Sequence, residues 1–241
     1  MFDSLNDFDR KASDIPRRPH KRPSYPHLWA FMCASPGANI GEKYERMLSD
    51  IAAFKNLFAT QCSKDFAVVP AFPFTFFGAK IKLPDDSVFT LDAGQVNTKD
   101  PLSVENVKKL YDYVKKWDEN RDRDPNTNNI PPSSIIIMYV SGDYIENDGF
   151  TTGYAFGNEL PYLIFLTNKA SSNTFAHEVG HVLNYSNKNG PKDDPDPASP
   201  PDKPSHNKNE GNLMYKEAGN TITQAQCAQF SESKIILRSH L

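Results

Sequence analysis

The sequence predicts an α+β fold in which a mixed, twisted β-sheet is backed by two helices and a third helix beneath it carries the functional site. Three observations predict this fold. Several apolar runs have the length of buried strands, two segments place apolar residues at helical spacing, and a third helical segment follows the last strand pattern. The 241 residues are enough for one large domain or for two subdomains around a cleft.

The strand-like runs alternate with helical segments in the first half of the chain and then follow one another. Buried strands are expected at 28–35, 133–145 and 160–168, and a short edge strand at 153–159. The segment 66–83 is aromatic and β-prone but contains Pro70 and Pro73. Because proline disrupts a strand ladder, we expect one or two strands there with an irregular corner.

Amphipathic helices are expected at 42–62, 103–120, 173–187 and 221–237. Asn173 can cap the third of these helices, and Thr221 or Thr223 the fourth. The chain then divides into three parts: a flexible polar and basic arm over 1–26, an N-terminal subdomain over 27–187 with the sheet and the site helix, and a C-terminal subdomain over 188–241. The last part begins with a Pro-rich loop, continues through a turn and closes with the final helix.

Composition excludes several classes of function. The net charge is −3 with both signs interspersed, so the chain has no overall character of a nucleic-acid-binding protein. No stretch approaches the length of a membrane span, and the N-terminus has no apolar core of a secretory signal. We therefore expect a protein made in the cytoplasm, which could be exported by a route other than general secretion.

The three cysteines, Cys33, Cys62 and Cys227, are far apart and form no C-x-x-C pair. This spacing argues against a cysteine zinc site and against a dense disulfide framework. The sequence leaves open whether two of these cysteines form a single disulfide.

The stretch AHEVGHVLNYSN, residues 176–187, carries the chemistry. On a helix, residues four apart share one face, so His177 and His181 can direct their imidazoles to one Zn²⁺ ion. Glu178 lies on a neighbouring face, from which it can reach a metal-bound water. Zinc lowers the pKa of that water toward ~7, so a carboxylate can take its proton at neutral pH and pass it to the leaving amine. With this composition, chance yields roughly 0.006 H-E-x-x-H matches, which disfavours a plain surface helix.

From this helix onward the chain resembles the metzincins, zinc endopeptidases with the pattern H-E-x-x-H-x-x-G-x-x-H, a methionine turn below the metal and a C-terminal helix. His177, Glu178 and His181 match the first part, and NLMY, 212–215, looks like the turn, with Met214 as its methionine. The resemblance covers residues 133–241, and the first half only by element order. It implies a metzincin-like fold whose edge strand and following strand line a substrate cleft, and it gives Met214 the role of an apolar floor under the zinc ligands.

Two positions depart from the family pattern. Asn184 stands where the family has glycine, and Asn187 stands where the family has its third histidine. Asparagine tolerates a left-handed conformation, so we expect the chain to turn at position 184 as it does at the glycine of the family. An amide oxygen is a poor zinc ligand, so Asn187 is not expected to complete the site.

Four kinds of residue remain open as the third ligand. We favour His206, because imidazole is a strong ligand and this residue lies eight positions before Met214. The alternatives are Asn187 itself, an aspartate of the Pro-rich loop, or a glutamate in the manner of the gluzincins. The aspartates are Asp193, Asp194, Asp196 and Asp202, and the glutamates are Glu210, Glu217 and Glu232.

The leading hypothesis for function is a zinc-dependent endopeptidase that acts as a monomer on a protein or peptide substrate. The alternatives are a gluzincin-type zinc hydrolase and a catalytically silent binding protein that keeps a zinc-peptidase scaffold. The retained Glu178 argues against the silent scaffold. A further hypothesis is that the protein is a delivered effector or toxin.

Overall fold

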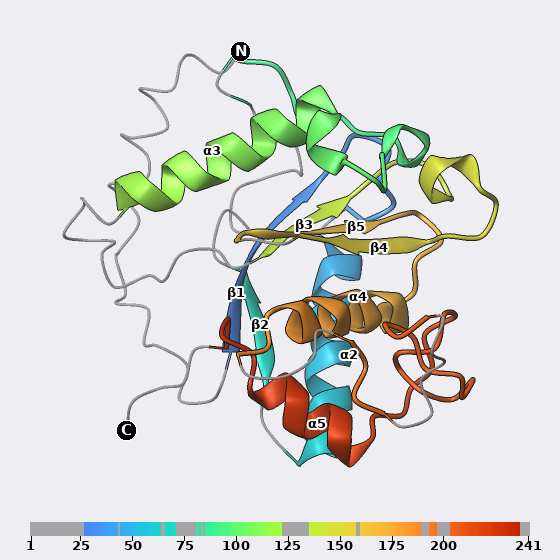
Figure 1. Ribbon diagram of the computed structural model, residues 1–241. Coiled ribbons are helices and arrows are strands. Elements are labelled where there is room, and N and C mark those ends of the chain that lie inside the picture. The colour runs from blue at the N-terminus through green and yellow to red at the C-terminus, as the bar shows by residue number, and fades with distance from the viewer. Residues whose placement is uncertain are drawn as a thin grey trace.

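Five strands form one mixed sheet in the order β2-β1-β3-β5-β4 (Figure 1). The computed structural model describes residues 27–42, 44–63, 66–70, 81, 83, 85–121, 135–157, 160–188, 193–196 and 203–236. The arm predicted over 1–26 lies outside this range. Four strands run parallel, and β4 pairs antiparallel with β5 at one edge. The strands are β1 His27–Ala34, β2 Ala67–Pro70, β3 Ile135–Tyr139, β4 Gly153–Phe156 and β5 Tyr162–Leu166.

Four α-helices and three short 3₁₀ helices accompany the sheet within the described residues. The α-helices are α2 Glu45–Cys62, α3 Glu105–Arg121, α4 Ser172–Tyr185 and α5 Gln224–Ser231; the 3₁₀ helices are η1 Ala93–Gln95, η2 Pro101–Ser103 and η3 Ile145–Asn147. These elements match the predicted order; β1 has the predicted length, and the other strands and the last helix are shorter than expected. Thr223 caps α5, as one of the two sequence alternatives proposed.

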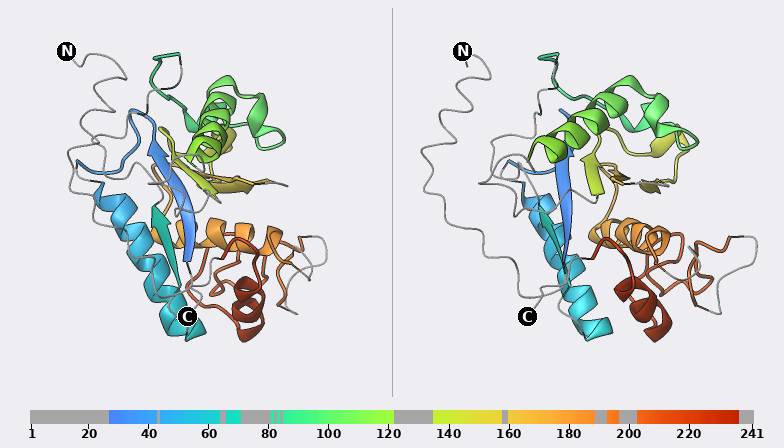
Figure 2. Two further views of the ribbon diagram at one scale, coloured as in Figure 1. Left: turned by 90° about the vertical axis from the view of Figure 1, so that its left-hand side faces the viewer. Right: turned by 60° about the vertical axis from the view of Figure 1, so that its left-hand side comes forward.

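The two faces of the sheet belong to two separate hydrophobic clusters. Along β1, Leu28, Ala30 and Met32 pack with α2, α4 and α5 on one face. Phe31 and Cys33 alternate with them and pack with α3 on the other. Figures 1 and 2 show this layering, with α3 on one side of the sheet and the other three helices on the opposite side.

The expected helices therefore cover both faces of the sheet: α3 covers one face, and α2 shares the other face with the site helix α4. The strand order supplies the reason. The chain moves from β1 outward to β2 through α2, and then back past β1 to β3 through α3. Right-handed crossovers in opposite directions place their helices on opposite faces of a sheet.

Two local predictions about α4 need correction. Ser171, not Asn173, is the N-cap: its hydroxyl accepts a hydrogen bond from the Thr174 backbone, and the Thr174 hydroxyl accepts one from the Ser171 backbone. Asn184 does not form a left-handed turn, because α4 continues in helical conformation to Tyr185. Its side chain explains this, since Asn184 Oδ1 accepts a hydrogen bond from Gln229 Nε2 of α5 at 2.8 Å.

The C-terminal part is joined to the first half by a disulfide between Cys62, the last residue of α2, and Cys227 of α5. The single bridge that the sequence left open is thus present. Cys33 remains a buried thiol. The division into subdomains at residue 187 stays a prediction.

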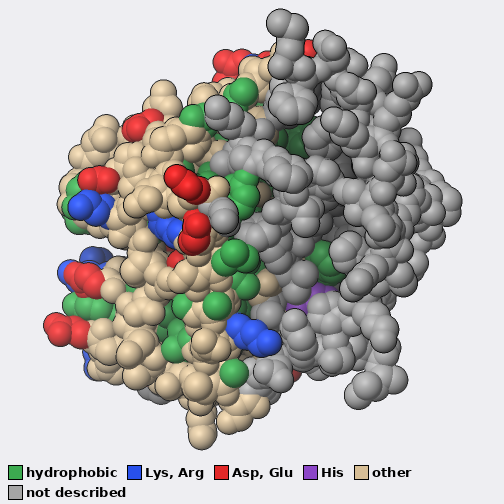
Figure 3. All heavy atoms as spheres, turned by 180° about the vertical axis from the view of Figure 1, so that it is seen from behind, with side chains coloured by type: hydrophobic (Ala, Val, Ile, Leu, Met, Phe, Trp, Pro, Cys, Tyr) green, Lys and Arg blue, Asp and Glu red, His purple; other side chains and the backbone are tan. Residues whose placement is uncertain are grey.

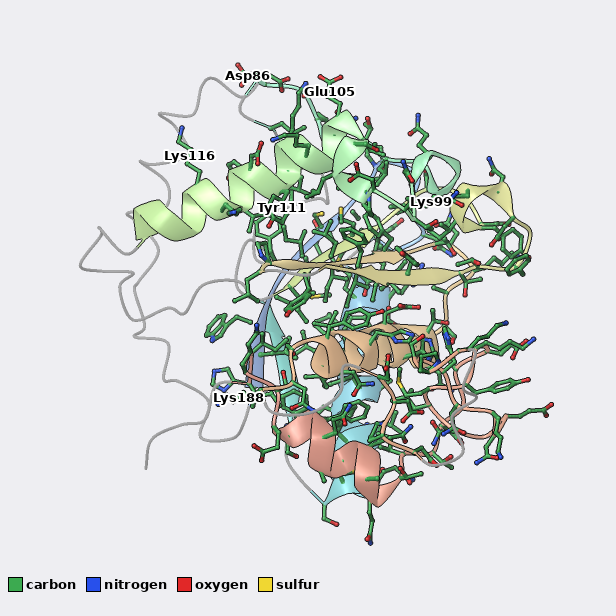
Figure 4. All side chains as sticks on the ribbon, in the orientation of Figure 1. Asp86, Lys99, Glu105, Tyr111, Lys116 and Lys188 are labelled. Carbon is green, nitrogen blue, oxygen red and sulfur yellow. A yellow bond between two sulfur atoms is a disulfide. The ribbon has the colours of Figure 1, made fainter. Side chains whose placement is uncertain are left out.

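The surface of the described residues carries no segregated patch of one charge on the face shown in Figure 3. In Figure 4, Tyr111 points from α3 toward the sheet, where its hydroxyl donates to the Leu160 carbonyl at 3.1 Å, while Lys116 points away. The described part of the face in Figure 3 carries acidic and basic side chains interspersed. None of the described helices combines the length and apolar character needed to cross a membrane.

Candidate metal centre

The helix α4 runs directly beneath the edge of the sheet (Figure 1). It presents two histidines on one face. The spacing of four residues places His177 and His181 one turn apart, and both are almost fully buried. Their Nε2 atoms lie 2.9 Å apart, and their rings are nearly perpendicular.

A backbone carbonyl orients the first histidine. His177 Nδ1 lies 2.6 Å from the carbonyl oxygen of Leu213. A carbonyl only accepts hydrogen bonds, so Nδ1 carries the proton and donates it, which leaves a lone pair on Nε2 for a metal. The Nδ1 of His181, in contrast, has no hydrogen-bond partner among the described residues.

His206 joins this pair from a turn in the C-terminal part. Its backbone N–H donates to the Lys203 carbonyl at 2.9 Å, which closes the turn. Its ring stacks on His177 with a centroid distance of 5.3 Å and meets His181 edge-on at 4.9 Å. One ligand atom from each of the three histidines lies within 4.8 Å of the other two.

The other candidates for the third position lie elsewhere or are engaged otherwise. The backbone of Asn187 forms a bridge with Ser233, and the carboxylate of Asp194 accepts hydrogen bonds from Gln226 and Asn207. Asp202 lies outside the described residues. The remaining candidates are not part of the histidine group: Asp193, Asp196, Glu210, Glu217 and Glu232.

The three imidazoles suit a metal such as zinc. Burial lowers the pKa of His177 to about 4 and that of His181 well below its usual value, and it also lowers the pKa of His206. All three rings are therefore neutral at pH ~7, which is the form that binds metals. Zinc–nitrogen bonds of about 2.0–2.1 Å separate tetrahedral ligand atoms by roughly 3.3 Å, a separation that falls within the 4.8 Å span of this group.

Glu178 lies against the edge strand β4. The backbone N–H of Ala155 donates to its carboxylate, and a Cβ placed on Gly153 would lie only 2.7 Å from Glu178 Oε1. Burial raises the pKa of Glu178 to about 8, against the opposite effect of the Ala155 hydrogen bond. A buried carboxyl whose pKa lies near neutral pH can both give and take a proton.

Met214 lies below the site helix. The backbone of Tyr215 donates to the Asn212 carbonyl at 3.0 Å, which closes a turn over residues 212–215. The Met214 side chain is fully buried, and its sulfur packs against Gly180 in the middle of α4. The same turn presents the Leu213 carbonyl to His177.

Several residues around the centre were not found from the sequence. Tyr185 stacks on His181 at a centroid distance of 5.9 Å, and its spacing of four residues from His181 was an available signal. Asp194 is a ligand candidate in the sequence, but nothing in the sequence indicates that it is buried together with Asn207, Asn212 and Gln226.

Comparison with known proteins gives a weak likeness. No model of a known protein family matches the sequence, and no curated protein matches it. Metalloproteinase-II from Bacteroides fragilis is similar to this chain with a TM-score of 0.43 and 16% identity, over 88% of this chain and 54% of that one. A chain of a chaperone–substrate complex has a TM-score of 0.43 and 15% identity, over 88% of this chain and 35% of that one. This chain therefore spans only part of the length of either protein, and its function is argued from its own residues.

Proposed function

We propose that the protein is a zinc-dependent endopeptidase with a metzincin-like arrangement of its site. The observation that carries the proposal is the convergence of three neutral imidazoles beside a buried carboxyl, that of Glu178. Three histidines with an open fourth position are typical of catalytic rather than structural zinc sites. In this proposal His177, His181 and His206 hold the metal, and Met214 forms the apolar floor beneath them.

The chain's own residues perform the proton transfers. A bound zinc ion would polarise the scissile carbonyl and lower the pKa of water to about 7. Glu178 takes a proton from the attacking water and returns it to the leaving amine, as a general base and then a general acid. Its buried place beside β4 keeps the carboxyl away from bulk solvent and would hold it close to a peptide bound along that strand.

The edge strand β4 offers a place for an extended peptide. It lies at the end of the sheet, so its outer side has no strand neighbour among the described residues. A substrate in extended conformation can bind there through its main chain, which gives affinity for many sequences. This arrangement favours cleavage within a protein or peptide chain.

Zinc content and turnover test the proposal together. We expect about one zinc per chain for wild type, Asn187→Ala and Glu217→Ala, and loss of zinc for His206→Ala. Zinc-loaded wild type should cleave an unfolded protein, and Glu178→Ala should keep its zinc but lose cleavage. A wild type without zinc would refute the proposal, and loss of zinc in Glu217→Ala alone would point to the gluzincin-type alternative.

The disulfide bears on where the protein acts. The Cys62–Cys227 bridge supports a place of action in oxidising surroundings, because such bridges persist outside the reducing cytosol. A delivered effector that works in a periplasm or outside cells fits this property. Expression of wild type and Glu178→Ala in the cytosol and in the periplasm of a host tests this role, since only wild type should arrest growth.

A further inference from the structure

Behind the metal centre lies a cluster of four buried polar side chains, Asp194, Asn207, Asn212 and Gln226, which we call the amide cluster. Gln226 is fully buried, and the other three are at most 7% exposed. Gln226 Nε2 lies 2.9 Å from Asp194 Oδ1 and 3.0 Å from Asp194 Oδ2. Such a cluster is costly to bury unless its groups satisfy one another, as they do here.

One end of the amide cluster fixes the turn that carries His206. The Asp194 carboxylate accepts a hydrogen bond from Asn207 Nδ2 at 3.2 Å, and the Asp194 backbone N–H donates to the Pro204 carbonyl at 2.9 Å. These two contacts hold the residues on either side of Ser205 and His206. The backbone N–H of Asn207 also donates to the Met214 carbonyl at 2.7 Å. The position of the His206 ring therefore depends on Asp194.

The other end fixes the turn that orients His177. The amides of Gln226 and Asn212 exchange two hydrogen bonds, of 3.0 and 2.9 Å. Asn212 Oδ1 also accepts from the Met214 backbone N–H at 2.8 Å. These bonds set the conformation of the turn, whose Leu213 carbonyl accepts from His177 Nδ1.

We propose that Asp194, Asn212 and Gln226 are positioning residues of the metal centre, which hold His206 and the Leu213 carbonyl where the three imidazoles converge. This inference rests on the proposed zinc site. Gln226 is itself held in place because its neighbour Cys227 is bonded to α2. Outer residues that orient metal ligands typically change metal affinity by about 10–100-fold when they are mutated.

The test compares zinc affinity in two near-isosteric variants, Asp194→Asn and Gln226→Glu. Asp194→Asn places an amide N–H against the Gln226 amide N–H, and Gln226→Glu places two carboxylates against each other. We expect the zinc Kd, measured by competition with a chelator, to rise about 10–100-fold in each. The absorption spectrum of the Co²⁺-loaded protein should change as well, because it reports the geometry of the ligands.

The double variant Asp194→Asn with Gln226→Glu exchanges the carboxylate and the amide across the pair. An amide N–H again faces a carboxylate, so we expect part of the zinc affinity and of the Co²⁺ spectrum to return. Non-additivity of this kind is the signature of residues in direct contact. A loss in the double variant equal to the sum of the two single losses would overturn the proposal.

Leu110→Ala serves as a matched control for stability. Leu110 is fully buried on α3, across the sheet from the metal centre, and its truncation should destabilise the fold by about 2–5 kcal/mol. We expect its zinc Kd and Co²⁺ spectrum to match those of wild type. An equal loss of affinity in Leu110→Ala would show a general effect of destabilisation and overturn the positioning role.

The outcomes separate this inference from the proposed function. A wild type that binds no zinc overturns the proposed function and the positioning role with it. A wild type that binds zinc, with single variants of unchanged affinity and spectrum, overturns the positioning role alone.

Discussion

The sulfur of Met214 lies 2.7 Å from the point where a Cβ on Gly180 would stand. The Met214 side chain therefore fills the space that a side chain at position 180 would need. The ring of Phe230 closes the same space at 3.6 Å. Gly180 lies between the two histidines of α4, in the turn that separates them. The absence of a side chain at Gly180 therefore allows the turn 212–215 to approach the site helix.

Gly180→Ala tests the close packing of Gly180 and Met214, because that packing decides whether the change stabilises or destabilises the fold. In an unconstrained helix interior this change stabilises by up to about 1 kcal/mol. Here we expect a loss of about 1–3 kcal/mol in the free energy of unfolding, because the new methyl group overpacks the contact with Met214. Denaturant-induced unfolding measures the change. In the double variant Gly180→Ala/Met214→Ala, the shorter side chain at 214 leaves room for the new methyl group, so the cost of overpacking should be smaller. A single variant more stable than wild type would contradict the close packing.

Gly153→Ala tests the place of Glu178. A Cβ at this position of β4 would lie 2.6 Å from Thr174 Cγ2 and 2.7 Å from Glu178 Oε1. The carboxylate must then move, and a displacement of about 1 Å in a catalytic group can lower turnover by about 100-fold. We expect kcat to fall by that order while zinc content stays at the wild-type level.

Gly211→Ala is the matched control for this prediction. A Cβ there would meet its nearest neighbour, Thr221 Oγ1, at an ordinary distance of 3.9 Å. Turnover and zinc content should both remain close to wild type. If Gly153→Ala cleaves as fast as Gly211→Ala, the Glu178 carboxylate does not need the position that β4 gives it.

The sequence predicted the parts of the site that depend on local spacing. His177 and His181 share a face because any helix places residues four apart together, and the structure keeps that geometry. The sequence favours His206 because of its ligand chemistry and its place before Met214, and the structure places it beside His177 and His181. Whether these residues hold zinc stays a prediction.

The rest depends on contacts between distant segments, which a local pattern does not encode. The apolar stripe of α2 indicates a buried face but not which side of the sheet it covers. Asn184 fits a left-handed turn as well as a helix, and its partner Gln229 lies 45 residues away. The carbonyl of Leu213 orients His177 through the backbone, so no side-chain motif could indicate it.

The disulfide should contribute strongly to stability. It closes a chain segment with a sequence separation of 165 residues, and constraint of the unfolded state by such a bridge is worth about 2–5 kcal/mol. We expect the double variant Cys62→Ser/Cys227→Ser to lose stability of that order in denaturant-induced unfolding. A reducing agent should weaken wild type equally and leave the double variant unaffected.

Cys33 provides an internal check that Cys62 and Cys227 form the disulfide. Burial raises the pKa of its thiol, so little thiolate is present near neutral pH. Native wild type should therefore resist alkylation, and after unfolding without reductant it should take up one alkyl group per chain, as measured by mass spectrometry. Three groups without reductant would show that Cys62 and Cys227 are not bonded to each other.

A buried carboxyl in α2 makes stability depend on pH. Asp50 is 2% exposed and accepts hydrogen bonds from the hydroxyls of Tyr139 at 2.9 Å and Ser172 at 2.7 Å. Burial raises the pKa of Asp50, against the opposite effect of these two bonds and of the Arg46 charge. The folded protein thus binds this proton more tightly than the unfolded chain, whose aspartates titrate near pH ~3.9.

The direction in which stability changes with pH follows from this difference between the folded and unfolded pKa of Asp50. Stability from protonated Asp50 is fully present below about pH 3.9 and is lost as pH rises toward the higher pKa of the folded state. Asp50→Asn keeps the shape of the side chain without this titration. We therefore expect the free energy of unfolding of wild type to fall relative to that of Asp50→Asn as pH rises from about 3.9 toward the pKa of Asp50 in the folded protein, as measured by denaturant-induced unfolding. A difference that moves in the other direction would show that Arg46, Tyr139 and Ser172 outweigh burial and that the folded protein prefers the charged carboxylate.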